Sequence, residues 1–124
     1  MIAALSAWHE DHEAAAEALA PVRALPAHVV LEVYSVLTRL PAGLTVPAAA
    51  AARALAVRFS AAPLELPDRS ALLGELSGVS GGASYDGLVA LEAAAHDLTL
   101  LTLDERAQVT YQRLGVAFEV VSAR

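Results

Sequence analysis

The chain contains no cysteine and no lysine. The absence of cysteine excludes disulfides, thiol nucleophiles and cysteine-ligated zinc, and it fits a reducing compartment. Because all eight basic residues are arginine, a P-loop, a Schiff-base lysine and the phosphate-facing lysine of a receiver domain are excluded too. No apolar run reaches the roughly 20 residues of a membrane span, and residues 1–5 lack the basic region of a signal peptide. We therefore expect a cytoplasmic protein that does not enter a membrane.

Positive charge is also scarce, since 8 arginines stand against 14 acidic residues and give a net charge of −6. A typical nucleic-acid-binding protein has a net positive charge, which is the opposite of this balance. An anionic partner would therefore need a local source of attraction at its binding site that the net charge does not provide. The 124 residues are 56% hydrophobic and 18% charged, which excludes intrinsic disorder. We expect one folded domain over residues 1–124.

The first half of the sequence predicts three helices. Apolar residues recur at helical spacing over residues 8–20 and 28–40, and Pro21 and Pro41 end these two patterns. An alanine-rich helix is predicted over residues 48–59.

The second half alternates between helical and strand patterns. It predicts a short strand over 63–67, a helix over 70–76 capped by Asp68, a helix over 85–96 capped by Ser84, a strand over 98–103, a helix over 104–113 stopped by Gly115, and a strand over 116–121. The final helix–strand–helix–strand order implies parallel strands joined by right-handed crossovers. The predicted fold class is therefore α/β with a parallel sheet.

Two aspartates are predicted to lie near the carboxyl end of this sheet. Asp104 directly follows the strand over 98–103, and Asp86 lies in the first turn of the helix that precedes that strand. Ligands of open α/β sheets bind beyond the carboxyl ends of the strands, next to helix N-termini, so the two carboxylates can converge. Each also has a purely structural interpretation, Asp104 as a helix cap and Asp86 as a first-turn acid favoured by the helix dipole.

A third carboxylate, Glu32, lies among apolar residues of the helix over 28–40. Val29, Val33 and Val36 flank it, so we expect its side chain on or beside the buried face, with no obvious basic partner one turn away. A buried carboxylate is costly unless it is paired or binds a cation, and Mg²⁺ and Mn²⁺ prefer oxygen ligands. Alternatively, the side chain reaches solvent along the helix or bonds to the backbone.

These three acids lie in segments that together resemble a known family. The segments Leu31-Glu32-Val33, Tyr85-Asp86-Gly87-Leu88 and Leu100-Leu101-Thr102-Leu103-Asp104 occur in the order typical of the PIN domain, and specifically of the VapC-type toxins of bacterial toxin–antitoxin operons. Residues 111–116 also resemble the last helix of the family turning into its last strand. The resemblance covers nearly the whole chain, and it implies a three-layer α/β/α fold with a parallel sheet.

The resemblance implies a divalent-metal-dependent ribonuclease. Glu32, Asp86 and Asp104 would hold Mg²⁺ or Mn²⁺, the hydroxyl of Thr102 would support the site, and the metal would activate water to hydrolyse an RNA phosphodiester bond. A metal between carboxylates and phosphate also reconciles an acidic chain with an RNA substrate. The expected partners are RNA, a cognate VapB-like antitoxin and a second copy of the chain, with arginines such as Arg106 helping to hold the RNA.

The chain departs from the family at its beginning. The family opens with a strand that ends in a first catalytic aspartate, before a helix that residues 2–5 resemble, and this strand and its aspartate are missing here. Neither Glu10 nor Asp11 is expected to replace the aspartate, because both lie at the solvated start of a helix. Either the start codon has been placed too late or the chain is a degenerate copy, and the three remaining acids favour the first explanation.

Two further motifs have weaker interpretations. Gly78-Val79-Ser80-Gly81-Gly82 matches the G-x-S-x-G motif of hydrolases, and His96 follows it, but a helix is predicted where that motif needs a strand. His9 and His12 lie among acids, which fits a solvated helix start better than a metal site. Two other functions stay open, a catalytically weak PIN-like protein-binding module and a metal-dependent phosphatase of small metabolites.

Overall fold

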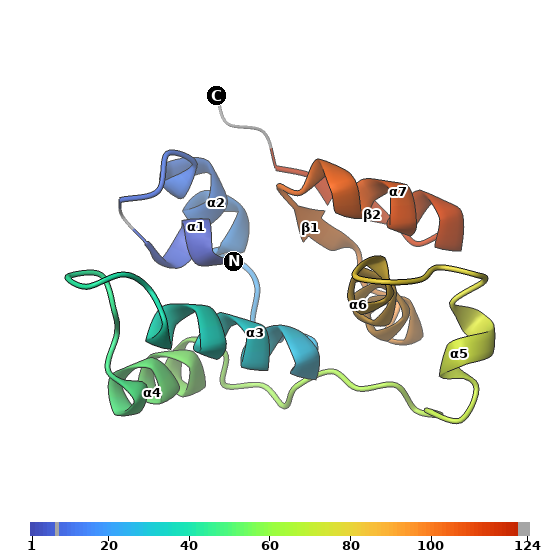
Figure 1. The fold of residues 1–124 in the computed structure, drawn as a ribbon, viewed down its shortest axis with the longest axis horizontal. Helices are drawn as coiled ribbons and strands as arrows, with labels where there is room; N and C mark the ends of the chain where they lie inside the picture. The colour runs from blue at the N-terminus through green and yellow to red at the C-terminus, as the bar shows by residue number, and fades with distance from the viewer. Residues whose placement is uncertain (7, 122–124) are drawn as a thin grey trace. The chain divides into compact units, whose positions relative to one another are not determined.

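The computed structural model describes residues 1–6 and 8–121, and the chain divides into two compact units (Figure 1). Unit 1 spans Met1–Pro63, and unit 2 begins at Leu64. The described part of unit 1 contains α1 (Ile2–Leu5), α2 (His12–Leu19), α3 (Ala27–Thr38) and α4 (Ala48–Arg58). The described part of unit 2 contains α5 (Leu72–Glu75), α6 (Ala83–Ala95), β1 (Leu100–Thr102), α7 (Glu105–Leu114) and β2 (Phe118–Val120).

Unit 1 is held together by apolar side chains at helical spacing. Helix α1 packs on α2, and α3 packs on α4. The buried cluster consists of Leu19, Leu25, Val33, Leu37, Ala51, Leu55 and Phe59. Its members on α3 and α4 are four residues apart, as expected for one face of a helix. The helices predicted over 28–40 and 48–59 are thus confirmed, with ends that differ by one or two residues.

Helix α2 is shorter than the predicted helix over residues 8–20. It begins at His12, because residues 9–11 form a turn in which the backbone N–H of Asp11 donates to Nδ1 of His9 at 3.1 Å. At its other end, the guanidinium of Arg58 donates to the carbonyl oxygens of Leu19 and Val22 at 2.6 and 2.7 Å. The end of α2 is therefore tied to α4 by a side chain that is distant in the sequence.

Unit 2 confirms the predicted parallel α/β arrangement. Strands β1 and β2 pair in parallel, with Leu100 opposite Phe118 and Thr102 opposite Val120, and α7 connects them and packs against β1 (Figure 1). The rings of Tyr111 and Phe118 lie 5.6 Å apart between α7 and β2. Helix α7 ends at Gly115, whose φ of 67° is the left-handed conformation that glycine adopts without strain.

Several boundaries in unit 2 differ from the prediction. The strands predicted over 98–103 and 116–121 are confirmed only at their centres, three residues each. Residues 63–67 form no strand beyond an isolated β-bridge at Leu64. The helix predicted over 70–76 is reduced to α5, because Asp68 accepts hydrogen bonds from the N–H and O–H of Ser70 in a turn before it. Ser84 is not a cap but the second residue of α6, and its hydroxyl donates to the carbonyl of Gly81 at 2.6 Å.

No helix in the described ranges is long and apolar enough to cross a membrane.

Candidate active site

Asp104 is held in place at the point where β1 leads into α7. Its Oδ1 accepts hydrogen bonds from the backbone N–H groups of Arg106 at 2.8 Å and Ala107 at 3.4 Å, so the predicted helix cap is confirmed. Its own backbone N–H donates to the hydroxyl of Thr102 at 3.0 Å, and Thr102 is buried. Within the described residues Oδ2 of Asp104 makes no hydrogen bond, and the residue is exposed. One carboxylate oxygen therefore serves the helix, and the other is available for a ligand.

Asp86 lies in the first turn of α6, as predicted, and it is half-buried. The next residue, Gly87, is buried against the side chain of Leu76, because a Cβ atom at Gly87 would lie only 2.6 Å from Cδ2 of Leu76. The glycine of the Tyr85-Asp86-Gly87-Leu88 segment is thus needed for close packing of the helix that carries Asp86. This requirement gives the motif a structural reason apart from any chemistry.

The two aspartates belong to helices that pack against each other. The Cβ position of Gly87 lies 3.6 Å from Cδ1 of Leu114, the last residue of α7, whereas Asp104 precedes the first residue of that helix. Over residues 1–6 and 8–121, no group of three or more histidine, aspartate or glutamate side chains is arranged to hold a metal ion. Convergence of the two carboxylates therefore stays a prediction.

Glu32 lies on α3 in unit 1, and the expectation that its side chain is buried is wrong. The side chain is 55% exposed, and its Oε1 lies 3.1 Å from Nε2 of His28, one turn earlier. Burial on α3 centres on Val33 and Leu37, so a residue one position before Val33 is turned by about 100° from that face. His28 is the nearby partner that the sequence argument overlooked, since a histidine four residues away on a helix is within reach of a glutamate.

Sequence reasoning did not single out Glu92, which is buried on α6 with 5% of its surface exposed. The available signal was its position next to Ala93 and three residues after Val89, which places it on the same buried face of the helix. A buried carboxylate is costly unless its charge is compensated. Of the acids on α6, Glu92 is the more deeply buried and therefore needs such compensation most.

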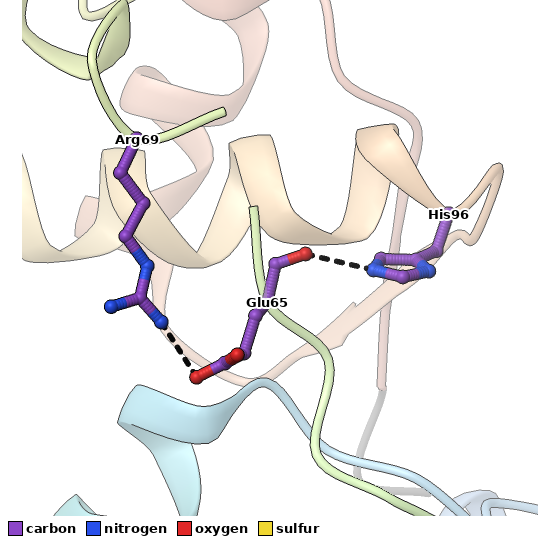
Figure 2. Close-up of polar contacts among 3 residues, drawn as sticks. All are labelled: Glu65, Arg69 and His96. Carbon is purple, nitrogen blue, oxygen red and sulfur yellow. Dashed lines mark hydrogen bonds and ion pairs between the residues drawn. The ribbon is translucent and has the colours of Figure 1, made fainter. Parts of the chain in front are cut away.

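The serine-hydrolase interpretation is excluded by the local structure. Ser80 is exposed in the loop between α5 and α6, and the elements on both sides of it are helices. Nε2 of His96 bonds to the backbone carbonyl of Glu65 at 2.9 Å, while the Glu65 carboxylate pairs with Arg69 at 2.6 Å (Figure 2). His96 therefore fastens the segment before α5 to the end of α6 through a backbone carbonyl.

A family model described as PIN domain matches residues 1–112, a range that includes most of both units. The chain belongs to the PIN-domain family. Ribonuclease VapC27 of Mycobacterium tuberculosis is 44% identical over 119 residues, which cover 92% of this chain and 79% of the relative. Ribonuclease VapC40 of the same species is 43% identical over 126 residues, which cover 98% of this chain and 94% of the relative. No solved structure matches the chain significantly.

Membership of the family confirms two expectations drawn from the residues. The VapC-type resemblance on the Glu32, Asp86 and Asp104 segments is confirmed by the family match and by the names of the relatives. The predicted α/β class with a parallel sheet is also confirmed, because the chain is a PIN domain and its strands β1 and β2, connected by α7, pair in parallel. The roles of the individual residues are a separate matter and rest on the geometry above.

Proposed function

We propose that this chain is a divalent-metal-dependent endoribonuclease that hydrolyses RNA phosphodiester bonds in the cytoplasm, as the toxin of a toxin–antitoxin pair. The observation that carries the proposal is Asp104 at the carboxyl end of β1, with one oxygen engaged in the α7 cap and the other left over. Its support from outside the chain is the similarity to two relatives named as VapC ribonucleases. We also propose that units 1 and 2 together form one PIN domain.

Glu32, Asp86 and Asp104 are the proposed ligands of Mg²⁺ or Mn²⁺. Carboxylate oxygens are the donors that these hard ions prefer, so the donor set fits such an ion. A divalent ion supplies Lewis acidity toward water and the phosphate oxygens. The exposed Glu32 side chain is able to change its direction, because its contact with His28 is the one polar contact it makes among the described residues.

Thr102 and the α7 backbone act on Asp104 as positioning groups. The Thr102 hydroxyl accepts the N–H of Asp104 and so fixes the backbone where the chain leaves β1. The two N–H groups of α7 then fix one carboxylate oxygen, which restricts the directions in which the other can point. Such preorganisation lowers the cost of assembling a site when substrate arrives.

The cognate antitoxin and a second copy of the chain are the proposed protein partners. Co-purification of the chain with the product of an adjacent antitoxin gene tests the first, and light scattering of the purified chain tests the second. A protein that remains monomeric at every concentration would contradict the homodimer.

Cleavage of a labelled RNA in the presence of Mg²⁺ or Mn²⁺ tests the nuclease proposal. We expect EDTA to abolish cleavage, and Asp86→Asn, Asp104→Asn and Glu32→Gln each to lower the rate by at least about a hundredfold, since these changes remove a ligand charge. Asp97→Asn is the matched control, because Asp97 is an exposed aspartate in the turn between α6 and β1. Cleavage that survives the Asp86→Asn, Asp104→Asn double variant would contradict the mechanism.

A second candidate function, protein binding with weak catalysis, is favoured by an apolar groove in unit 1. The groove has a volume of about 400 Å³ between α3 and α4, and its lining includes Val30, Leu31, Tyr34, Leu55 and Phe59. Leu31 is 64% exposed there, which suits an interface with an apolar partner. If this function is the correct one, the folded chain binds the antitoxin and cleaves no RNA under any metal condition.

A further inference from the structure

The described part of unit 2 contains three arginines that differ in their contacts. Arg69 is paired with the Glu65 carboxylate at 2.6 Å (Figure 2). Arg106 and Arg113 are both exposed residues of α7, and neither forms an ion pair with any described residue. In the described part of unit 2, the arginines without an ion-pair partner thus both lie on α7.

Both arginines lie on the same face of α7. The exposed residues of this helix are Glu105, Arg106, Val109, Gln112 and Arg113, and the buried ones are Ala107, Thr110 and Tyr111. Arg106 and Arg113 are seven residues apart, which is about two turns and about 10 Å along the axis. Val109 lies between them and is 67% exposed. We name the residues Arg106, Val109, Gln112 and Arg113 the α7 face.

The α7 face has a neighbouring segment at each end, Asp104 at one and the loop before α6 at the other. The backbone N–H of Arg106 donates to Oδ1 of Asp104. The side chain of Arg106 therefore starts close to that carboxylate. Nη2 of Arg113 lies 3.2 Å from the Cβ position of Gly78, in the loop that leads into α6 and Asp86. Arg106 is therefore next to Asp104, and Arg113 lies against the loop that precedes the helix of Asp86.

We propose that the α7 face binds the sugar–phosphate backbone of the RNA substrate, with Arg106 and Arg113 each contacting one phosphate. The inference rests on the proposed ribonuclease function. A chain of net charge −6 repels a polyanion, so binding requires cations at the place where the strand passes. Guanidinium groups bind phosphate oxygens in a bidentate way, and the exposed Val109 offers an apolar contact to a ribose or base between them.

Binding of a short fluorescent single-stranded RNA to the full chain in EDTA tests the proposal without cleavage. We expect Arg106→Gln and Arg113→Gln each to weaken binding by about fivefold, as the loss of an exposed charged contact does. Each should also reduce the slope of log affinity against log salt by about 0.7, the value for one phosphate of a single strand. Arg106→Lys and Arg113→Lys keep the charge and should restore the slope, whereas the affinity should return only in part, because lysine cannot bind a phosphate in a bidentate way.

Arg69→Gln is the matched control, because it removes the same charge from unit 2 at a residue already paired with Glu65. Equal losses in all three glutamine variants, or no loss in Arg106→Gln and Arg113→Gln, would overturn the proposal. Loss of antitoxin binding by these two variants with unchanged RNA binding would identify the α7 face as a protein interface and overturn it too. Wild-type chain that binds RNA through these arginines but never cleaves it would leave this inference standing and remove the ribonuclease function.

Discussion

Helix α7 of unit 2 and helix α2 of unit 1 end in different ways. In unit 2, α7 begins at Asp104, which caps it, and ends at Gly115, which turns the chain in the left-handed conformation. In unit 1, Arg58 binds the carbonyl of Leu19, the last residue of α2 and 39 residues away, and the carbonyl of Val22 just after the helix, 36 residues away. The helix that carries the candidate catalytic aspartate is therefore defined by neighbours in the sequence, and α2 is completed by a distant side chain.

This difference has a consequence for the site. A cap made by adjacent residues forms as soon as the helix forms, so the orientation of Asp104 needs no distant partner. A cap made by Arg58 exists only after α4 has packed against the rest of unit 1, and it also places the guanidinium 4.8 Å above the ring of Phe59. We therefore expect loss of the Asp104 cap to affect mainly α7, and loss of the Arg58 contacts to affect the packing of unit 1 as well.

The largest effect is expected from Arg58→Gln. The variant loses two hydrogen bonds from a charged group to the end of α2, so the free energy of unfolding should fall by about 2 kcal/mol. Arg53→Gln, on an exposed residue of the same helix, should change it by less than about 0.5 kcal/mol. Urea unfolding measures both, and equal values for the two variants would show that the Arg58 contacts add nothing to stability.

Gly87→Ala is expected to lower the free energy of unfolding by about 1 to 2 kcal/mol. The added Cβ atom would overlap Cδ2 of Leu76, and this overpacking outweighs the better helix propensity of alanine. Gly74→Ala is the control with the opposite sign, because nothing lies within 4 Å of its Cβ position in α5, and it should stabilise the protein by about 0.5 kcal/mol. Thermal unfolding of the two variants in parallel checks the signs, and a stabilising Gly87→Ala would contradict the close packing.

Asp104 allows its structural and catalytic roles to be separated. Asp104→Ala removes the cap and should cost about 1 kcal/mol, whereas Asp104→Asn keeps an acceptor for the α7 N–H groups and should stay within about 0.3 kcal/mol of the wild type. Both variants should lose metal-dependent cleavage. Unfolding and RNA cleavage are measured on the same variants. An Asp104→Asn variant that retained activity would contradict the catalytic role, and one that unfolded as readily as Asp104→Ala would contradict the capping role.

The smallest effect is expected at Asp68. Hydrogen bonds from the hydroxyl and backbone N–H of Ser70 hold the pKa of the Asp68 carboxyl below its ordinary value. A lowered pKa in the folded state adds stability at higher pH, and this contribution is lost from about pH 4 downward as the carboxylate is protonated. The wild type should therefore lose slightly more stability between pH 5 and pH 3 than Asp68→Asn, and NMR titration of Asp68 would contradict this if its pKa were not lowered.

Much of unit 2 was predictable because its signals are short in range. The Asp104 cap, the Gly115 stop and the alternation of helix and strand depend on residues within a few positions of each other. The strands were predicted too long because apolar, β-suited residues continue beyond the three residue pairs in register between β1 and β2. Helix α5 begins later than predicted for a reason that is also local. The side chain of Asp68 accepts the N–H of Ser70 and forms a turn in place of the first residues of the predicted helix.

The candidate site was predicted less completely. The predicted strand and helix ends led to Asp86 and Asp104, and the PIN-domain resemblance added Thr102. The structure then shows the Thr102 hydroxyl accepting the N–H of Asp104, two residues later. The exposure of Glu32 did not follow from its apolar neighbours, because a shift of one residue on a helix turns a side chain by about 100°. Its partner His28 was visible in the sequence at a spacing of four and was overlooked.

The sequence by itself determined the PIN-family pattern, the parallel helix–strand units and the local cap that orients Asp104, because hydrogen bonds between near neighbours and apolar periodicity are written directly in the order of residues. Only the tertiary structure decided that Gly87 must lack a side chain beside Leu76, that Arg58 completes α2, and that Arg106 and Arg113 of the α7 face are exposed. These features depend on which surfaces come within a few ångströms of each other and which stay in water. Such distances arise from packing over the whole unit, which no short stretch of residues specifies.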